Sequence, residues 1–523
     1  MAPRFRLAVL AACSLPVGLP SIALAQNAPA TNTTVSDTNA LLKRIEEQDR
    51  RIEALERKLQ HQEELEAQAS TRSAAERSAT PVPSSTATAG ATAAVSGKAA
   101  ISASTTPTGP AGSSQGAAGT VVVGPAGLFI QSADGANIIR FRGNLAVDGR
   151  WYSDHSTPVT ADTWTFRRVR PYFEGTLDRI YDFRFMPDFG NGKSIIVDAF
   201  VTGRFAPWFA VQAGKFKGPV GLERLQPDQF NRFMELGFPS ALVPNRDLGV
   251  QIGGDIAGGT LGYAVGYFDG TTEGNSTDAN TSPDVDNDGK KDLEARLFAQ
   301  PFVKSANPYL RGLGFGIGGT YVNTTGSATN TLLATYKTPG QQNFFTYRTG
   351  TTATYADGKR ERFSPQFYYY TGGLGVIGEY VQSNQDVSRQ VTNTQKRSDT
   401  LDNKAWQISL SYFLTGERAS YNSYTPKSTF EPGKPGWGAW EVAFRFHQLQ
   451  IDDAAFLGGS ASFADPAASP RKATAAGVAL NWYLNQNVKW TFDYERTRFD
   501  GGAAGGNDRP GENAFLTRFS LVY

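Results

Sequence analysis

The last residues of the chain, 514–523, alternate between apolar and polar side chains with a period of two. Phe515, Phe519 and Tyr523 share one face of such a segment. Arg518 and Ser520 share the other face. A strand with one apolar and one charged face can separate lipid from a water-filled lumen, as the strands of transmembrane β-barrels do. The pattern therefore predicts a membrane-spanning strand that ends on a C-terminal aromatic residue.

The same alternation recurs from residue 138 to the end of the chain, in segments separated by turn residues. We expect strands at 138–152, 164–177, 181–188, 194–203, 208–216, 249–256, 260–270, 294–302, 312–322, 360–370, 373–384, 402–415, 438–452, 473–485, 488–499 and 514–523. An even number suits a bacterial barrel whose termini both face the periplasm. The predicted fold is all-β: a 16-stranded antiparallel transmembrane β-barrel over 138–523.

The parity of the alternation assigns the two faces of each strand. In segment 438–452, Trp440 and Phe444 should face lipid, whereas Arg445 and His447 should face the lumen. A soluble β-sandwich could also alternate. It would not usually place so many aromatic residues at strand ends, where a membrane girdle requires them.

Parity also places the connections between strands. The long segment 217–248 should be external, in the position of the loop that commonly folds into the lumen of a porin, and 271–293 and 323–359 should also be external. Segment 416–437 falls on the periplasmic side, although it is far too long for a tight turn. Either the strand count is wrong there, or this segment folds into the pore from the periplasmic side.

The region before the barrel divides into three zones. Residues 1–25 form a predicted signal peptide, because arginines precede an apolar run and a small-x-small cleavage site; a lipoprotein box around Cys13 is the alternative. Residues 38–68 carry heptads that predict a short periplasmic coiled coil, or else a single solvated helix. Residues 69–119 are rich in Ala, Ser, Thr, Gly and Pro, and they predict a disordered linker.

Composition narrows the class of protein further. Aromatic residues make up 12% of the chain and charged residues 19%, and past the first 25 residues no run of about 18 apolar residues occurs. This pattern excludes a helical membrane protein. The net charge of +2 is carried by the signal-peptide arginines. The mature chain is therefore near neutral, and we expect no nucleic-acid partner and no cofactor.

Basic side chains recur on the predicted lumen faces and near the long third loop. The candidate anion path consists of Arg140, Arg142, Arg150, Arg168, Arg170, Arg184, Lys215, Lys217, Arg224, Arg232, Arg360 and Arg362. A guanidinium on the lipid side would cost about 2–4 kcal/mol at mid-membrane, so the strand arginines should face the lumen. A ladder of such groups would pass anions from site to site. Alternatively, each arginine pairs with a lumen carboxylate and braces the wall.

Several motifs of the barrel region resemble the phosphate-selective porin O/P family over nearly all of 138–523. They include Phe141-Arg142-Gly143, Arg167-Arg168-Val169-Arg170, Gly214-Lys215-Phe216-Lys217, Asp247-Leu248-Gly249-Val250-Gln251, Tyr412-Phe413-Leu414-Thr415-Gly416-Glu417 and Leu480-Asn481-Trp482-Tyr483-Leu484-Asn485. The resemblance implies a homotrimer in the outer membrane of a Gram-negative bacterium. It also implies an arginine ladder, a constriction with lysines for phosphate or polyphosphate, and a periplasmic segment that enters the lumen. We expect the barrel-assembly machinery to recognise the C-terminal strand.

The predicted constriction departs from this family pattern. Between Gly218 and Asn245 there is no lysine, and Arg224 and Arg232 are the only bases. Arginine holds phosphate bidentately but does not replace a compact ammonium. The expected function is therefore passive diffusion of anions, and phosphate specificity stays open.

Other functions are weighed against this one. The alternatives are a general or organic-solute porin, an envelope tether that uses the coiled coil, and an outer-membrane enzyme. The last is disfavoured because the three histidines, His61, His155 and His447, have no evident serine and carboxylate partners in sequence context. A stretch from Asp284 opens like a calcium loop, but Ala295 stands where the bidentate carboxylate is due, so we expect a solvated acidic loop.

Overall fold

The computed structural model describes residues 119–124, 127–153, 161–279 and 283–523. The predicted signal peptide and coiled coil, and all but the last residue of the predicted linker, lie outside these residues and stay predictions. In the described part of the chain, no helix is both long and apolar enough to cross a membrane.

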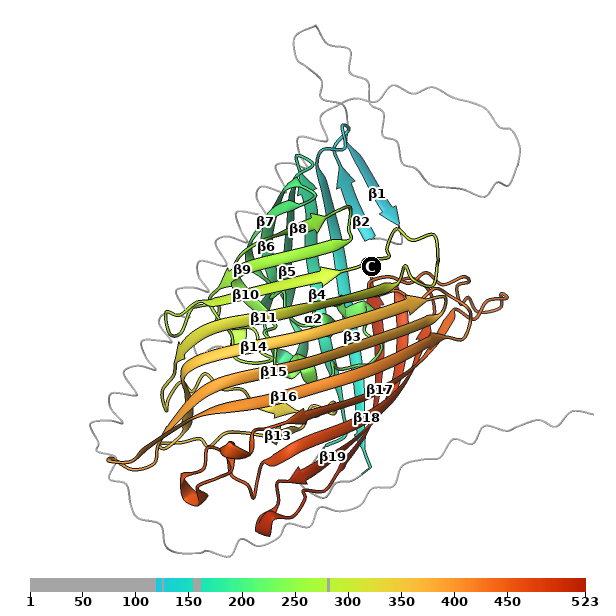
Figure 1. Cartoon of the computed structure of the whole chain (residues 1–523). Helices are drawn as coiled ribbons and strands as arrows, with labels where there is room; N and C mark the ends of the chain where they lie inside the picture. The colour runs from blue at the N-terminus through green and yellow to red at the C-terminus, as the bar shows by residue number, and fades with distance from the viewer. Residues whose placement is uncertain (1–118, 125–126, 154–160, 280–282) are drawn as a thin grey trace, which may run out of the picture. The chain divides into compact units, whose positions relative to one another are not determined.

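Sixteen antiparallel strands close into a barrel, as the alternation predicted (Figure 1). They are β3 (Ile138–Tyr152), β4 (Thr163–Leu177), β5 (Tyr181–Asp188), β6 (Ile195–Ala206), β7 (Phe209–Lys217), β8 (Arg246–Ile256), β9 (Leu261–Phe268), β10 (Asp292–Ala299), β11 (Leu313–Thr325), β14 (Thr354–Thr371), β15 (Leu374–Gln390), β16 (Lys396–Phe413), β17 (Ala439–Gln450), β18 (Pro470–Tyr483), β19 (Val488–Gly501) and β20 (Glu512–Val522). The barrel closes where β20 pairs with β3, with Ala514 opposite Tyr152 and Val522 opposite Asn144.

The predicted assignment of faces is confirmed. On β17, Phe444 is 49% exposed on the outer surface, whereas Arg445 is 3% and His447 0% exposed in the interior. The C-terminal strand β20 behaves in the same way, because Phe515 and Phe519 point outward and Arg518 is buried inside. The barrel therefore has an apolar outside and a polar inside, as a lipid-embedded wall requires.

A hairpin before the barrel was missed by the strand count. Strands β1 (Thr120–Gly124) and β2 (Gly127–Gln131) pair with each other, and β2 pairs with β3 over Ile138–Phe141. The sheet therefore has eighteen strands, although only sixteen form the barrel. The part of β3 that pairs with β2 precedes the part that pairs with β20, so the hairpin extends the wall without entering the ring.

The two ends of the barrel differ in the length of their connections. At the turn end most connections are tight, such as 207–208, 257–260 and 372–373. At the loop end they include the long segments 218–245, 269–291, 326–353 and 451–469. Short turns face the periplasm and long loops face outside in barrels of this kind.

Short helical turns and one small hairpin lie within the connections. The helical turns are η1 (Gly190–Gly192), α2 (Leu222–Leu225), η2 (Asp228–Phe230), η3 (Phe238–Ala241), η4 (Thr277–Ala279), η5 (Asp453–Ala455), η6 (Gly459–Ala461) and η7 (Ala504–Gly506). The hairpin consists of β12 (Tyr336–Lys337) and β13 (Asn343–Phe345).

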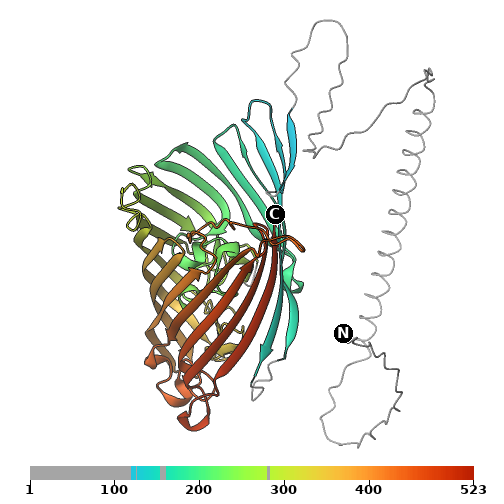
Figure 2. The same ribbon diagram turned by 90° about the vertical axis from the view of Figure 1, so that its right-hand side faces the viewer.

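An apolar core fills part of the barrel interior. Loop residues Tyr336, Phe345 and Phe463 pack together with the inward-facing Leu401 of β16 and Leu449 of β17. Side chains from the loops therefore occupy the space next to these strands. Figure 2 shows chain segments inside the barrel. The two large cavities of the lumen are lined mainly by residues of β3 to β9 and of the segment between β7 and β8.

Candidate functional site

The segment between β7 and β8, residues 218–245, folds into the lumen as predicted; we call it the constriction loop. Its backbone N–H groups donate to side chains of the far wall. Leu222 N donates to Glu379 Oε1 at 2.7 Å and Phe238 N donates to His447 Nδ1 at 3.1 Å. Met234 N donates to Asp493 Oδ2 at 3.1 Å. These bonds satisfy loop donors that would otherwise be buried without partners.

A second segment reaches the constriction loop from the turn end. Residues 414–438, here the turn-side segment, connect β16 and β17. The Tyr421 hydroxyl donates to Leu222 O at 2.5 Å, and Arg232 Nη2 donates to Ser420 O at 2.6 Å. All sixteen predicted strands are present, so the strand count was not the cause of the anomalous length. The interpretation that this segment folds into the pore is confirmed.

Two large cavities run along the β3 to β9 side of the lumen. The inner cavity, of about 740 Å³, reaches residues next to the tight turns, such as Asp255 and Gly262. The outer cavity, of about 360 Å³, reaches loop residues such as Lys337. Arg170, Asp228 and Arg246 line both cavities, so these residues mark the junction between the two ends of the barrel.

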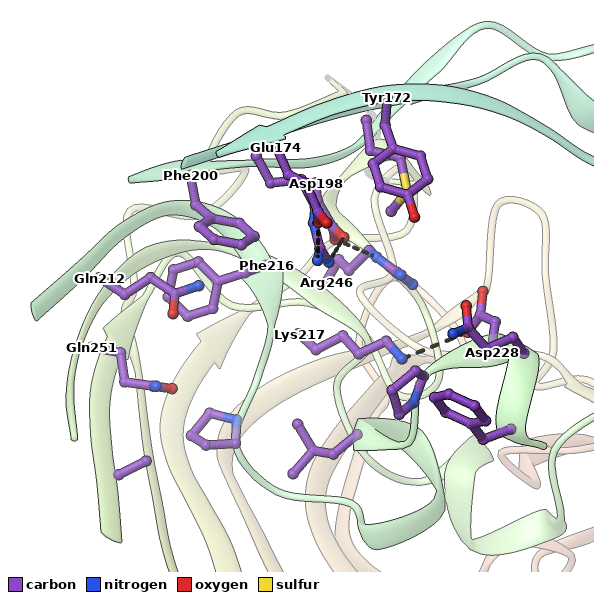
Figure 3. Close-up of a pocket in the computed structure, with 18 of the residues that line it drawn as sticks. Tyr172, Glu174, Asp198, Phe200, Gln212, Phe216, Lys217, Asp228, Arg246 and Gln251 are labelled. Carbon is purple, nitrogen blue, oxygen red and sulfur yellow. Dashed lines mark hydrogen bonds and ion pairs between the residues drawn. The ribbon is translucent and has the colours of Figure 1, made fainter. Parts of the chain in front are cut away.

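At this junction, basic side chains converge on one carboxylate of the constriction loop. Asp228 Oδ2 lies 2.6 Å from Arg170 Nη1 and 3.1 Å from Arg168 Nε. Lys217 Nζ lies 3.6 Å from Asp228 Oδ1 and also donates to Gln226 O at 2.9 Å. Figure 3 shows Lys217 pointing toward Asp228. Burial opposes ionisation of Asp228, but Arg168, Lys217 and Arg170 outweigh it and hold its pKa well below the usual range.

A second carboxylate of the constriction loop collects three arginines. Glu235 Oε1 lies 3.0 Å from Arg150, 2.9 Å from Arg167 and 3.1 Å from Arg518. Burial would raise the pKa of Glu235, but Arg167, Arg518 and Arg150 outweigh it and hold that pKa well below its usual range. The constriction loop is therefore attached to the wall by ion pairs on its own acidic residues.

Only some of the predicted basic residues line the two large cavities. Those that do are Arg142, Arg168, Arg170, Arg184, Lys217 and Arg224. Arg142 and Arg184 share Glu174, with N–O distances of 2.7 Å each. Arg224 donates to Ser240 O at 2.5 Å, and burial lowers its pKa to about 10. These six side chains therefore face the two cavities of the lumen, and their role in anion passage stays a prediction.

The other six predicted residues do not line either of the two large cavities. These are Arg140, Arg150, Lys215, Arg232, Arg360 and Arg362. Arg360 and Arg362 pair with Asp292 at 3.6 and 3.0 Å, and Arg232 pairs with Glu441 at 3.2 Å. Lys215 is 2% exposed and pairs with Asp278 and Asp284. These ion pairs support the bracing interpretation for Lys215, Arg232, Arg360 and Arg362. A role in anion passage stays a prediction for all six residues.

Several basic residues near the site were missed by the sequence analysis. Arg167 has the parity of a lipid-facing residue, but the pairing of β3 with β4 skips it: Ala146 lies opposite Arg168 and Val147 opposite Phe166. This β-bulge lets Arg167 turn inward to Glu235. Arg246 was missed because β8 begins before the predicted residue 249.

In the stretch that resembles a calcium loop, the aspartates pair with lysine side chains. Asp284 pairs with Lys215 at 2.5 Å, and Asp286 pairs with Lys291 at 2.5 Å. In the part of the chain that the structure describes, no group of three or more His, Cys, Asp or Glu side chains could hold a metal ion. Lys215 therefore joins the strand wall to this loop.

A closed barrel with an apolar outside, a charged lumen and an inward-folded third loop has the architecture of a porin. The family model of the phosphate-selective porins O and P matches residues 139–523. The chain therefore belongs to this family, and it is an outer-membrane channel of a Gram-negative bacterium rather than an enzyme.

Individual relatives are more distant. Porin O of Pseudomonas aeruginosa is 25% identical over 152 residues, which cover 29% of this chain and 34% of that protein. The match thus spans about a third of its length. Among solved structures, the outer-membrane channel DcaP of Acinetobacter baumannii is 10% identical with a TM-score of 0.45, covering 75% of this chain and 99% of that chain. An anion-selective porin from Comamonas acidovorans is 11% identical with a TM-score of 0.44, covering 74% and 100%.

Proposed function

We propose that the barrel is a passive channel for anions, with phosphate or polyphosphate as the favoured solute. The observation that carries this proposal is the junction of the two cavities. There, Arg168, Arg170 and Lys217 converge on a single carboxylate. A solute that passes from one cavity to the other must pass this group of cations.

The charge balance of the lumen supports anion preference. Six basic and four acidic side chains line the inner cavity. Seven basic and five acidic side chains line the outer cavity. The excess is modest, but a charge pair at 4 Å is worth about 4 kcal/mol at an effective dielectric constant near 20, against about 1 kcal/mol in bulk water. The excess of basic over acidic side chains in each cavity supports a preference for anions.

The proposal that phosphate is the favoured solute rests on the geometry of the hydrogen-bond donors and on the family to which the chain belongs. Guanidinium groups bind phosphate oxygens bidentately, and Lys217 supplies an ammonium at the same place. Asp228 already occupies these donors, so an incoming phosphate must share or displace it. We therefore infer a weak site, which suits conduction because a bound ion must also leave.

A general or organic-solute porin is the second candidate. It is favoured by the pairing of most lumen arginines with carboxylates, such as Arg170 with Asp188 at 2.6 Å and Arg246 with Asp198 at 2.8 Å. In such a channel the charges would brace the wall and orient solutes without selecting phosphate.

Assembly belongs to the proposal as well. We infer a homotrimer in the outer-membrane bilayer, inserted by the barrel-assembly machinery through the C-terminal strand. The region before the barrel could tether this trimer within the periplasm. Removing residues 26–119 distinguishes the channel from the tether. The shortened protein should keep its conductance, whereas it could no longer act as a tether.

The decisive experiment is planar-bilayer conductance of the purified full-length protein in asymmetric KCl, repeated with phosphate added. A reversal potential on the anion side, with chloride current blocked by phosphate, would support the phosphate channel. Anion preference without block would indicate a general anion porin. A preference for cations, or no preference between anions and cations, would contradict the proposed anion channel. It would mean that the lumen carboxylates neutralise the basic side chains.

A further inference from the structure

A third cavity lies at the loop end, away from the channel. It has a volume of about 440 Å³ and shares no lining residue with the inner or outer cavity. Its walls come from segments 343–352, 465–469 and the loop between β19 and β20, together with the end of β15. We call it the loop pocket. Long loops of such barrels face outside, so the loop pocket opens on the external side.

Three guanidinium groups line the loop pocket, and two of them are held together. Arg389 Nη1 donates to Ser462 O at 2.5 Å, and Arg348 Nε donates to the same oxygen at 3.1 Å. Two positive charges that share one carbonyl acceptor necessarily lie side by side. Like charges at such a distance repel, so this arrangement favours an anion between or beside them.

The carboxylates near the loop pocket do not neutralise the charges of Arg348 and Arg389. The one acidic side chain among the lining residues is Asp465, whose Oδ2 lies 3.3 Å from Arg348 Nη1. Arg389 is 6% exposed, and its acceptors are neutral oxygens of Thr352, Ser460 and Ser462. Within the described residues, no carboxylate lies within ion-pair distance of Arg389. A nearly buried guanidinium without a counter-ion therefore lines the cavity.

The third guanidinium retains most of its donors. Arg509 donates from Nη1 to Asn343 O at 3.1 Å and lies over the ring of Phe499 at 5.1 Å. A guanidinium has five N–H groups, so several remain for a ligand. Hydroxyl groups of Thr346, Thr349, Thr352, Tyr347 and Ser469 also belong to residues of the lining.

We propose that the loop pocket is an external binding site for a phosphate group. Several guanidiniums against one carboxylate fit a multiply charged oxyanion, because guanidinium forks match phosphate oxygens in geometry and charge. The phosphate group could belong to free inorganic phosphate or to a phosphorylated lipid headgroup of the outer leaflet. Both sources would present the same phosphate oxygens to the guanidinium groups, and the experiment below distinguishes between them. The proposal goes beyond the channel, since the loop pocket is not on the conduction path.

The test is equilibrium dialysis of the full-length protein, purified in detergent, against radiolabelled inorganic phosphate at low ionic strength. The variant Arg509→Gln removes the guanidinium with the fewest structural bonds, and Arg348→Gln removes one of the adjoining pair. Arg498→Gln is the matched control, because Arg498 is an exposed arginine of β19 that does not line the loop pocket. We expect Arg509→Gln to weaken one phosphate site per chain about tenfold, the effect of losing a charge-assisted contact of about 1.4 kcal/mol.

The outcomes are distinct. Loss of that site in Arg509→Gln and Arg348→Gln, but not in Arg498→Gln, would establish the loop pocket. Competition by a bisphosphorylated glucosamine disaccharide would then assign it to a lipid headgroup, and lack of competition would assign it to free phosphate. Equal phosphate binding by the wild type and both pocket variants would overturn the proposal. The conductance of Arg509→Gln should equal that of the wild type. The channel proposal is tested separately, by the ion selectivity measured in the bilayer, so the failure of one proposal can be told from the failure of the other.

Discussion

In the constriction of the barrel, Oδ2 of Asp228 lies 2.6 Å from Nη1 of Arg170, and the same oxygen lies 3.1 Å from Nε of Arg168. The carboxylate thus takes the place that an anion would take among these cations. It comes from the constriction loop, whereas both arginines come from β4. In the proposed anion channel, selectivity should therefore depend on a contact between two parts of the chain.

Replacing Asp228 with Asn should raise anion selectivity. The substitution removes the negative charge and keeps the shape of the side chain, so Arg168, Arg170 and Lys217 become available to the solute. We expect a larger anion-side reversal potential and block at roughly tenfold lower phosphate, the equivalent of about 1.4 kcal/mol. Asp255→Asn is the control, because it removes the same charge from the inner cavity away from the junction. Equal effects of both substitutions would mean that only net charge matters.

Two neighbouring lysines provide a second test. Lys217→Gln should reduce anion selectivity, because Lys217 Nζ lies at the junction, 3.6 Å from Asp228. Lys215→Gln should leave selectivity unchanged and lower the thermal unfolding temperature, because Lys215 is buried against Asp278 and Asp284. Removing one partner of a buried ion pair typically costs about 3–5 kcal/mol. Bilayer reversal potentials and heat-induced unfolding followed by circular dichroism measure the two effects, and a reversed assignment would contradict the geometry.

The strands were predictable because each one repeats a local pattern. Alternation with a period of two is visible in every membrane-spanning strand, as in Phe444 and Arg445, and it needs no knowledge of the neighbouring strands. The hairpin β1–β2 escaped because two strands of five residues each are too short for the alternation to be recognised. The inward course of the turn-side segment was one of two interpretations of its anomalous length, and the family resemblance also implied it.

The ion pairs were not predictable in the same way. Glu235 and Asp228 lie far in sequence from the strand arginines that they contact, and nothing in the pattern says which loop residue reaches which wall. Arg167 shows the difficulty most clearly. Its parity assigns it to lipid, and only the bulge opposite Ala146 and Val147 turns it toward Glu235. The face of the wall on which a strand residue lies thus follows from local alternation except where a bulge interrupts the pairing, whereas its ion-pair partner depends on how the whole barrel folds.

The turn-side segment should limit the conductance. The Tyr421 hydroxyl donates to Leu222 O, and its ring stacks on Tyr368 with centroids 5.3 Å apart. Tyr421→Ala removes both contacts, so we expect the constriction loop to move more freely, with a larger and noisier single-channel current. Lys427→Ala changes an exposed residue of the same segment and should behave as wild type. Identical single-channel traces of Tyr421→Ala and wild type would show that the segment does not support the constriction loop.

Acid should release the constriction loop only at low pH. The pKa values of Asp228 and Glu235 are held well below their usual values of 3.8 and 4.5, mainly because nearby arginines outweigh the effect of burial. A carboxylate whose pKa is depressed in the folded state contributes stability above its unfolded pKa and loses it as the pH falls through the folded pKa. Thermal stability and reversal potential should therefore not respond to these two groups between about pH 5 and 8. Below about pH 4 the thermal stability should fall, and the anion-side reversal potential should increase, because protonation removes the same negative charge as Asp228→Asn. Asp228→Asn should show a smaller acid-dependent loss of stability. A transition near neutral pH that disappears in this variant would mean that Asp228 is not held ionised by its arginines.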